Sequence, residues 1–300
     1  MNNYKVVLFL LLANLFWAGN YILGKYVVAE LTPLQMTFCR WLIAIFLLFP
    51  IAHWVERPVW RDVWKRWKTL IVLAVLGIVS YNFLLYEALR FTTSMNAALV
   101  NAMNPAVIVI FSALLLKESI SRMKVLGLLV SLLGVLLVLT NGQLQQIFHM
   151  DYNAGDLLML LAIVVWTLYS IAGRKMKGLP PIAATAASAL IGLLLVAPFF
   201  FLSGGLSLPI SAAAAWGIVY MGIFPSVGSF IFWNAALRQI GVSRAGIYLN
   251  LITVFTAILS LALGKPITIV QIAGGLLVFA GVYLTGRTAA QPVPEPDERK

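Results

Sequence analysis

The stretch SMNAALVNAMNPAVIVIF, residues 94–111, is an apolar segment that carries three asparagines and a proline close to its centre. Amide groups are costly to bury in hydrocarbon unless they find partners. Pro105 removes a backbone donor and frees the carbonyl of Asn101, four residues earlier. Only protein or cavity water can satisfy such a break inside a bilayer. The stretch therefore predicts a membrane-spanning helix with a polar interruption.

The whole chain has the composition of a membrane protein. Of its 300 residues, 62% are hydrophobic and 10% are charged, whereas about 25% of the residues in soluble proteins are charged. The net charge of +11 is spread over short gaps between apolar runs, which argues against a nucleic-acid-binding face and for charge-directed membrane insertion. A single cysteine, Cys39, excludes an intrachain disulfide and a cysteine metal cluster. The two histidines do not suggest a metal centre, and we expect no cofactor.

Ten apolar runs are long enough, at roughly 17 to 25 residues, to cross about 30 Å of hydrocarbon. They cover residues 6–24, 34–52, 69–89, 95–116, 123–140, 156–173, 182–202, 212–234, 244–263 and 268–286. No small-x-small cleavage site follows the first run, so we expect it to be retained rather than removed as a signal peptide. The predicted fold class is an all-α polytopic membrane protein with ten transmembrane helices.

The basic residues predict how these spans are oriented. With the N-terminus inside, the inner segments hold 17 of the 21 lysines and arginines. The outer segments hold Lys25, Arg90 and Lys265, and Arg40 lies within the second span. Under the positive-inside rule this excess predicts a multi-pass protein of the cell membrane with both termini in the cytoplasm.

The first inner loop contains WRDVWKRWK, in which Trp60, Trp64 and Trp67 recur at helical spacing with basic residues between them. This pattern predicts a short interfacial helix on anionic lipid. We interpret it as an anchor rather than a regulatory element.

The two halves of the chain resemble each other at a nearly constant offset of 147 to 149 residues. The matched positions are Trp17 and Trp166, Gly24 and Gly173, Pro50 and Pro198, Arg90 and Arg238, Gly127 and Gly274, and Gly134 and Gly281. Each half holds five spans, and because five is odd the second half enters the bilayer from the opposite side. We therefore predict two inverted five-helix repeats, residues 1–141 and 153–287. An outer loop, 142–152, joins them, and a disordered cytoplasmic tail, 288–300, follows.

The order of these features resembles the drug/metabolite transporter superfamily, in its ten-helix EamA group. The resemblance is carried by WAGNYILGKY, by RWL at Arg40, by EALRFTTSMNAALVNAMNP, by LLLKESIS and by the second-half copies VVWTLYSIAGRK, WNAALRQIGVSRAGIYLN and LALGKPITIVQIAGG. It implies that spans one, three, four, six, eight and nine surround a central cavity, and that spans five and ten are peripheral. Members of the group move amino acids, purine-type metabolites and cationic drugs, commonly outward. One departure is that Glu118 has Lys265 as its counterpart.

Polar and aromatic residues inside the spans are the candidate substrate-binding residues. Ser94, Asn101 and Asn104 fall within roughly an 80° arc of their helix, which favours a cavity lining over interhelical hydrogen bonds worth about 1 kcal/mol each. Tryptophans within spans suggest aromatic walls, although core packing explains them equally well. The full set is Trp17, Asn20, Asn82, Tyr86, Asn101, Asn104, Trp166, Tyr169, Trp233 and Asn250, with Asn234 beside it.

Two ionisable residues lie inside or near spans. Arg40 is about two turns into span two and Glu87 is near the outer end of span three. We expect Arg40 to extend outward and pair with Glu87 or a carbonyl. The alternatives are that Arg40 binds a substrate carboxylate or that Glu87 carries a proton.

Three residues predict weak points in the helices. Pro225 in span eight lies opposite Gly77 in span three at an offset of 148, and Pro105 interrupts span four. Since proline and glycine both weaken a helix, we predict hinges at these positions.

These features favour an alternating-access secondary transporter, an exporter by family likeness, of small neutral or zwitterionic metabolites such as amino acids, or of amphipathic drugs. The alternatives are a channel, which would need a continuous polar pore, and a membrane-embedded enzyme, which would need a reactive constellation in the spans. No GxxxxGK[ST] sequence occurs, so the chain does not hydrolyse ATP by that motif. We expect a monomer in a lipid bilayer, with Glu87 available for proton coupling, and no nucleic-acid partner.

Overall fold

The computed structural model describes residues 3–92, 94–149, 153–176, 178–206, 209–264 and 266–286, and within these ranges the regular structure is entirely helical. Among the described residues, nine helical spans are long and apolar enough to cross a membrane, and the shorter apolar helix α15 occupies the tenth predicted run. The predictions for Lys265 and for the tail 288–300 lie outside the described residues.

The first half contains α1 (Asn3–Val27), α2 (Pro33–Val55), the short α3 (Trp60–Lys65), span three, span four and α8 (Arg122–Thr140). Span three is built from α4 (Trp67–Leu73), the π-helix η1 (Ala74–Ser80) and α5 (Tyr81–Phe91). Span four is built from α6 (Ser94–Asn101) and α7 (Asn104–Leu116). The 3-10 helix η2 (Leu144–His149) follows α8.

The second half repeats this order with α9 (Ala154–Lys175), α10 (Pro181–Leu202), span eight, span nine and α15 (Ile269–Gly286). Span eight contains α11 (Ala212–Ile223), the π-helix η3 (Phe224–Ser229) and α12 (Phe230–Ile240). Span nine contains α13 (Val242–Gly246), the 3-10 helix η4 (Ile247–Asn250) and α14 (Leu251–Ala262). The halves are therefore interrupted at matching spans.

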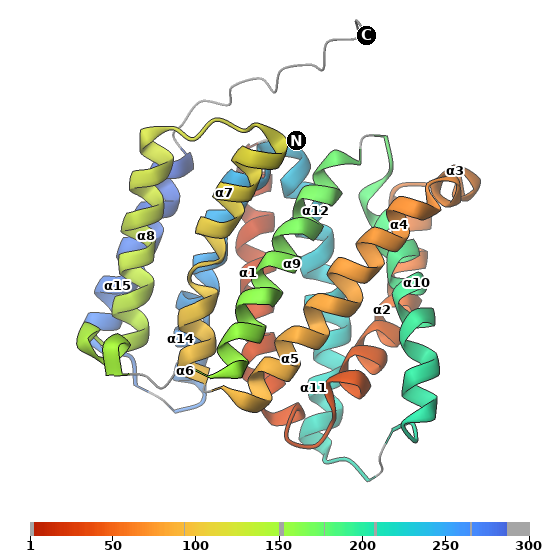
Figure 1. Cartoon of the computed structure of the whole chain (residues 1–300), viewed down its shortest axis with the longest axis horizontal. Helices are drawn as coiled ribbons and strands as arrows, with labels where there is room; N and C mark the ends of the chain where they lie inside the picture. The colour runs from red at the N-terminus through yellow and green to blue at the C-terminus, as the bar shows by residue number, and fades with distance from the viewer. Residues whose placement is uncertain are drawn as a thin grey trace, which may run out of the picture.

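The two halves have opposite directions in the bundle. In Figure 1, α1 starts at the end where α15 finishes, whereas α9, the first helix of the second half, starts at the other end. We call the first end the basic end, because Arg61, Arg122, Arg174 and Arg238 lie at the helix termini there, and the other the opposite end. This antiparallel relation confirms the inverted repeat.

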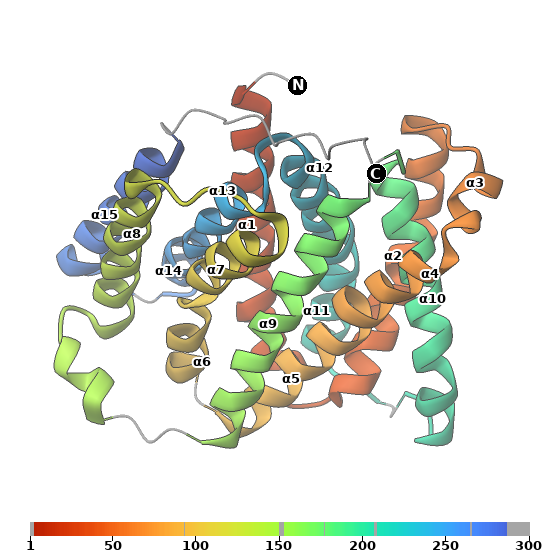
Figure 2. The same cartoon turned by 45° about the horizontal axis from the view of Figure 1, so that its top comes forward.

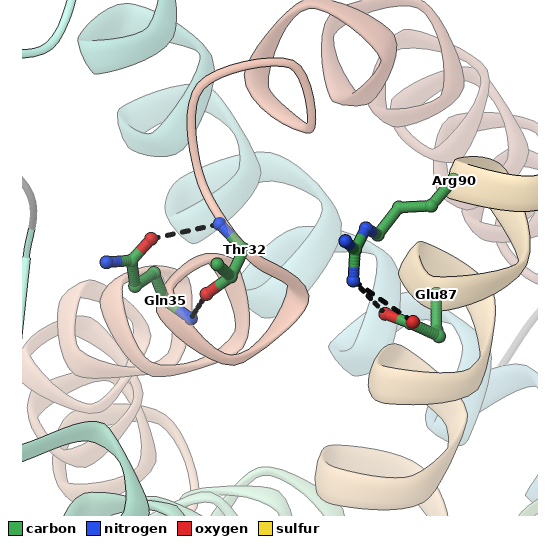
Figure 3. Close-up of polar contacts among 4 residues, drawn as sticks. All are labelled: Thr32, Gln35, Glu87 and Arg90. Carbon is green, nitrogen blue, oxygen red and sulfur yellow. Dashed lines mark hydrogen bonds and ion pairs between the residues drawn. The ribbon is translucent and has the colours of Figure 1, made fainter. Parts of the chain in front are cut away.

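Side-chain caps begin several spans. Thr32 caps α2: its hydroxyl accepts from the Gln35 backbone N–H at 3.3 Å, and the Gln35 amide oxygen accepts from the Thr32 N–H at 2.9 Å. Figure 3 shows this reciprocal pair at the first turn. Asn153 and Asp156 form the same arrangement at the start of α9. Because the first N–H groups of a helix have no partner within it, these caps fix where each span begins.

Spans five and ten, α8 and α15, pack side by side at one edge of the bundle (Figures 1 and 2). A Cβ atom placed on Gly134 would lie 2.5 Å from the carbonyl oxygen of Gly274, and one placed on Gly281 would lie 2.5 Å from that of Gly127. Such distances leave no room for a side chain. The glycines therefore serve close helix packing, and the predicted peripheral position of these spans is confirmed.

The interfacial helix is shorter than the tryptophan spacing predicts. Helix α3 ends at Lys65, and Trp67 already belongs to α4. Arg66, with φ −95° and ψ 28°, breaks the helix between them. Trp60 packs against Phe49 with ring centroids 5.1 Å apart, so the segment also contacts α2.

Replacing Gly134 with alanine should destabilise the α8–α15 contact. The new methyl group meets a backbone carbonyl, which cannot rotate away, and we expect a loss of about 1–3 kcal/mol. Gly275→Ala on α15 is the matched control, because its Cβ would lie 3.5 Å from a Val254 methyl group, an ordinary contact. Thermal unfolding of the purified variants checks this. Equal melting temperatures for the two variants would contradict the packing role.

Candidate functional site between the repeats

Spans three and eight are interrupted by π-helical segments at corresponding positions. Gly77 lies within η1 and Pro225 lies within η3. A π-helical turn leaves backbone carbonyl groups without their usual hydrogen-bond donors. Polar side chains donate hydrogen bonds to these carbonyls instead. The Asn82 amide donates to the carbonyls of Gly77 and Ile78 at 3.1 and 2.8 Å, and the Ser226 hydroxyl donates to the carbonyl of Met221 at 2.7 Å.

The Arg40 guanidinium joins these two interruptions. Its Nε donates to the Ser226 hydroxyl at 2.8 Å and its Nη1 donates to the Asn82 amide oxygen at 2.9 Å. Nη1 also donates to the Tyr86 hydroxyl, which in turn donates to the Asn20 amide oxygen at 3.2 Å. We call Asn20, Arg40, Asn82, Tyr86 and Ser226 the Arg40 cluster; these side chains come from spans one, two, three and eight, and each is at most 4% exposed.

The predicted pairing of Arg40 with Glu87 is wrong. Glu87 accepts both of its hydrogen bonds from Arg90 at 3.1 Å, one turn along the same helix. Figure 3 shows this pair at the end of α5, across from the start of α2. The spacing of three residues places the two charges on one helix face, so Glu87 is neutralised locally at the rim while Arg40 turns inward.

Arg40 has no carboxylate partner in the part of the chain that the structure describes. All six carboxylates described there are engaged elsewhere, at helix ends or in the ion pairs Lys65–Asp62 and Arg90–Glu87. The guanidinium carbon lies 5.7 Å from the Trp41 ring centroid and 5.8 Å from that of Tyr86. These aromatic faces offset part of the cost of the buried charge.

Aromatic rings fill the middle of the interface between the repeats. Trp17 lies against Trp166 at 5.1 Å and against Trp233 at 5.6 Å between ring centroids, and Trp41 lies against Phe230 at 5.0 Å. The aromatic layer comprises Trp17, Trp41, Tyr81, Trp166, Phe230 and Trp233. The indole N–H groups of Trp41 and Trp166 are buried without an acceptor among the described residues. A ligand can enter this layer only if the rings separate.

A second polar cluster lies on the basic-end side of the layer. The Asn234 amide donates to the Tyr169 hydroxyl at 2.8 Å and to the Thr185 hydroxyl at 3.2 Å. We call these three residues the Asn234 cluster. They line a pocket of about 10 Å³ together with Arg238 and others, which has room for about one water molecule.

The two clusters are related by the repeat. Positions 20 and 169 are 149 apart, and positions 86 and 234 are 148 apart. The first cluster pairs Asn20 with Tyr86, and the second pairs Tyr169 with Asn234. An asparagine–tyrosine hydrogen bond therefore occurs in both halves, once on each side of the aromatic layer. The residue types are exchanged, so the tyrosine donates in the first pair and the asparagine in the second.

The asparagines of spans four and nine have other surroundings. Asn101 ends α6 and Asn104 begins α7, so they flank a break at residues 102–103, just before Pro105. The Asn104 amide oxygen has no partner in the described part. Asn250 donates to the Ser131 hydroxyl of α8 at 2.8 Å and thereby joins spans nine and five. The structure does not bring these three amides into either cluster. The side chain of Ser94 lies outside the described residues.

Carboxylates tie the two halves together at both ends of the bundle. At the basic end, Glu56 accepts from the backbone N–H groups of Ile182 and Ala183 at 2.9 and 2.8 Å, and Glu118 accepts from those of Val242 and Ser243. At the opposite end, Glu30 accepts from Ser211, and Asp156 accepts from Thr92. The hydrogen bonds from Ser211 lower the pKa of Glu30, whereas burial raises the pKa of Glu56 against the effect of its backbone donors. Ties at both ends, with the rings in contact between them, define a closed arrangement.

Sequence reasoning missed several members of the site. None of the three residues Ser226, Phe230 and Trp41 was a candidate. Each is uncharged, and Ser226 and Trp41 directly follow the candidates Pro225 and Arg40. Phe230 lies 148 residues after Asn82. The repeat offset therefore identifies it as the counterpart of a candidate residue. The role of Glu118 as a helix cap could not be read from the sequence, because its partner Ser243 is 125 residues away.

The inverted repeats, the interrupted spans and the buried polar clusters between them define a helical membrane protein of the transporter class. The sequence profile of the EamA-like transporter family matches residues 4–140 and 153–287. The chain belongs to this family, which confirms the resemblance seen in the sequence.

Similar proteins extend over most of the chain. "Uncharacterized transporter YyaM" of Bacillus subtilis (strain 168) is 31% identical over 94% of this chain and 93% of its own. "Aromatic amino acid exporter YddG" of Ancylobacter novellus is 26% identical over 81% of this chain and 83% of its own. A solved crystal structure with a TM-score of 0.76 and 22% identity covers 94% of this chain and 96% of its own, which supports the fold.

Replacing Pro225 with alanine should slow transport more than it weakens substrate binding, because the restored backbone N–H favours a regular helix through η3. Pro198→Ala in α10 is the matched control, since Pro198 lies inside a helix without a π-segment. At Gly77 an added Cβ would lie 2.5 Å from the Cε2 atom of the Tyr169 ring and closer still to Cδ2, so alanine there also disturbs the site. Initial transport rates and equilibrium binding check the prediction. Unchanged rates in Pro225→Ala would count against a hinge.

Proposed function

We propose that the chain is an alternating-access secondary transporter for small neutral or zwitterionic organic molecules, with amino acids as the first substrates to test. The observation that carries this proposal is the aromatic layer between two repeat-related polar clusters. A site placed on the pseudo-twofold axis of two inverted repeats can be opened by either half in turn. The unfilled indole donors of Trp41 and Trp166 provide hydrogen bonds for acceptor groups of a ligand.

The ties at the two ends support alternation. At each end a small number of hydrogen bonds joins the two halves. Breaking one set while the other holds would expose one polar cluster at a time. The π-helical segments at Gly77 and Pro225 supply flexible points in spans three and eight.

The similarity to an aromatic amino acid exporter favours amino acids with aromatic side chains and outward transport. The basic end then faces the cytoplasm, in keeping with the positive-inside rule. Glu87 is the residue to test for proton coupling, although its ion pair with Arg90 places it at the rim. A single chain holds both halves of the site, so a monomer suffices.

Transport by reconstituted protein tests this function. Proteoliposomes loaded with labelled phenylalanine, tyrosine or tryptophan should release the label faster than protein-free vesicles, and unlabelled substrate on the outside should accelerate the release by exchange. A pH gradient that leaves the rate unchanged would remove Glu87 as a proton carrier. If none of a panel of amino acids moved while a lipid or nucleotide sugar did, the substrate class would be wrong.

Cysteine accessibility tests the alternation. In a Cys39→Ser background, we expect Asn20→Cys to react with a membrane-impermeant reagent only from the opposite end, and Asn234→Cys only from the basic end. A transported substrate should change the two labelling rates in opposite directions, because one closure opens the other side. Tyr26→Cys, exposed at the end of α1, controls for reagent access. Simultaneous labelling of both buried positions would indicate a channel instead.

A further inference from the structure

Arg40 has hydrogen-bonding capacity that the protein does not use. A guanidinium group carries five N–H donors. One N–H of Nε donates to Ser226, and the two of Nη1 donate to Asn82 and Tyr86. The two N–H groups of Nη2 donate to none of the described residues. Arg40 is nevertheless only 2% exposed, so this buried cation has an unfilled donor and no carboxylate partner among the described residues.

The Arg40 guanidinium lies beside the aromatic layer, where the polar end of an amphipathic organic acid would be. On α1, Asn20 of the cluster is one turn from Trp17 of the aromatic layer, and on span eight Ser226 is one turn from Phe230. Trp41 follows Arg40 directly. A ligand whose aromatic or apolar part separates the rings would therefore have its polar end beside the guanidinium.

A carboxylate is the group that best fills this position. Arginine binds carboxylates through two parallel N–H groups, and such charge-assisted pairs are about twice as strong as neutral hydrogen bonds. Both N–H groups of Nη1 are held by Asn82 and Tyr86, while Nε is held only by the Ser226 hydroxyl. The edge formed by Nε and Nη2 is thus the one that a carboxylate can take, with Ser226 as the single acceptor to displace.

Resting on the transporter function proposed above, we propose that Arg40 is the binding residue for the carboxylate of a small organic substrate. One carboxylate oxygen accepts the hydrogen bond that Nε now donates to Ser226. The other accepts a hydrogen bond from Nη2. Ser226 belongs to η3, so the exchange breaks the hydrogen bond between α2 and the π-helical segment of span eight, while Asn82 keeps its hydrogen bond to Arg40. Substrate binding and the loosening of one hinge are then a single event.

Four compounds that differ at the polar end test the carboxylate requirement: L-phenylalanine, 3-phenylpropionate, L-phenylalaninamide and phenethylamine. Binding to purified wild-type protein is measured by calorimetry. We expect the two carboxylates to bind about 10- to 100-fold more tightly than the amide and the amine, the range for hydrogen bonds to charged groups. Arg40→Gln should remove this difference by weakening the binding of the two carboxylates, and it should not weaken phenethylamine, whose ammonium group the guanidinium repels; Arg40→Lys should give an intermediate loss for the carboxylates.

Ser226→Ala distinguishes ligand binding from a structural role and does not depend on the folding of an Arg40 variant. Removing the competing acceptor should strengthen carboxylate binding about two- to tenfold, the range for a neutral hydrogen bond, with no change for phenethylamine. Ser229→Ala is the matched control, because the Ser229 hydroxyl, also in η3, donates to the Ala13 carbonyl and does not contact Arg40. A purely structural Arg40–Ser226 bond predicts weaker binding of all four compounds instead.

The possible failures are distinct. If wild-type protein binds the amide and the amine as tightly as the acids, or if Ser226→Ala weakens carboxylate binding, the role of Arg40 is wrong and the transporter function stands. If wild-type protein binds none of the four compounds, the proposed substrate class is wrong, and this inference is overturned with it.

Discussion

The backbone of a chain in hydrocarbon must satisfy its own hydrogen bonds, and this constraint accounts for most of the structure. Regular helices meet it within each span. Where spans three and eight depart from the regular helix, the freed carbonyls are taken by Asn82 and Ser226, and the Arg40 guanidinium holds both of these side chains. The two interruptions are therefore joined through a single side chain.

Charge placement follows from the same solvent. The described carboxylates cap helices or pair with a neighbour at the bundle ends, where water is near and the cost of the charge is small. Arg40 is the exception, since it lies about 10 Å along α2 from its first residue, at 1.5 Å per residue. Insertion scales give about 2.5–3.5 kcal/mol for a charge at a helix centre. Neutral hydrogen-bond acceptors and two aromatic faces offset that cost only in part.

The repeat is symmetric in architecture and asymmetric in chemistry. Both halves place an asparagine–tyrosine hydrogen bond beside the aromatic layer, yet Arg40 donates directly to the tyrosine of the first pair, whereas Arg238 lines the pocket beside the second. The position of Arg40 in the second half, 148 residues later, is Ser188, whose hydroxyl donates to the carbonyl of Ala184. Two inverted halves can thus exchange conformations while the substrate keeps one preferred polar partner. Direction and specificity can then be set by residues that the symmetry does not repeat.

The amino-acid sequence by itself determined the membrane environment, the number of spans, the inverted duplication, the weak points at Gly77 and Pro225 and the tryptophans at the centre. These features depend on composition, on hydrophobic periodicity and on the repeat offset, all of which are given by the order of residues along the chain. It did not determine which polar groups meet. Glu87 has a partner three residues away, so Arg40 turned to Asn82, Tyr86 and Ser226, the last of them 186 residues distant. Only the tertiary structure could decide such pairings, because they depend on which helix faces come together and on which partners are already taken.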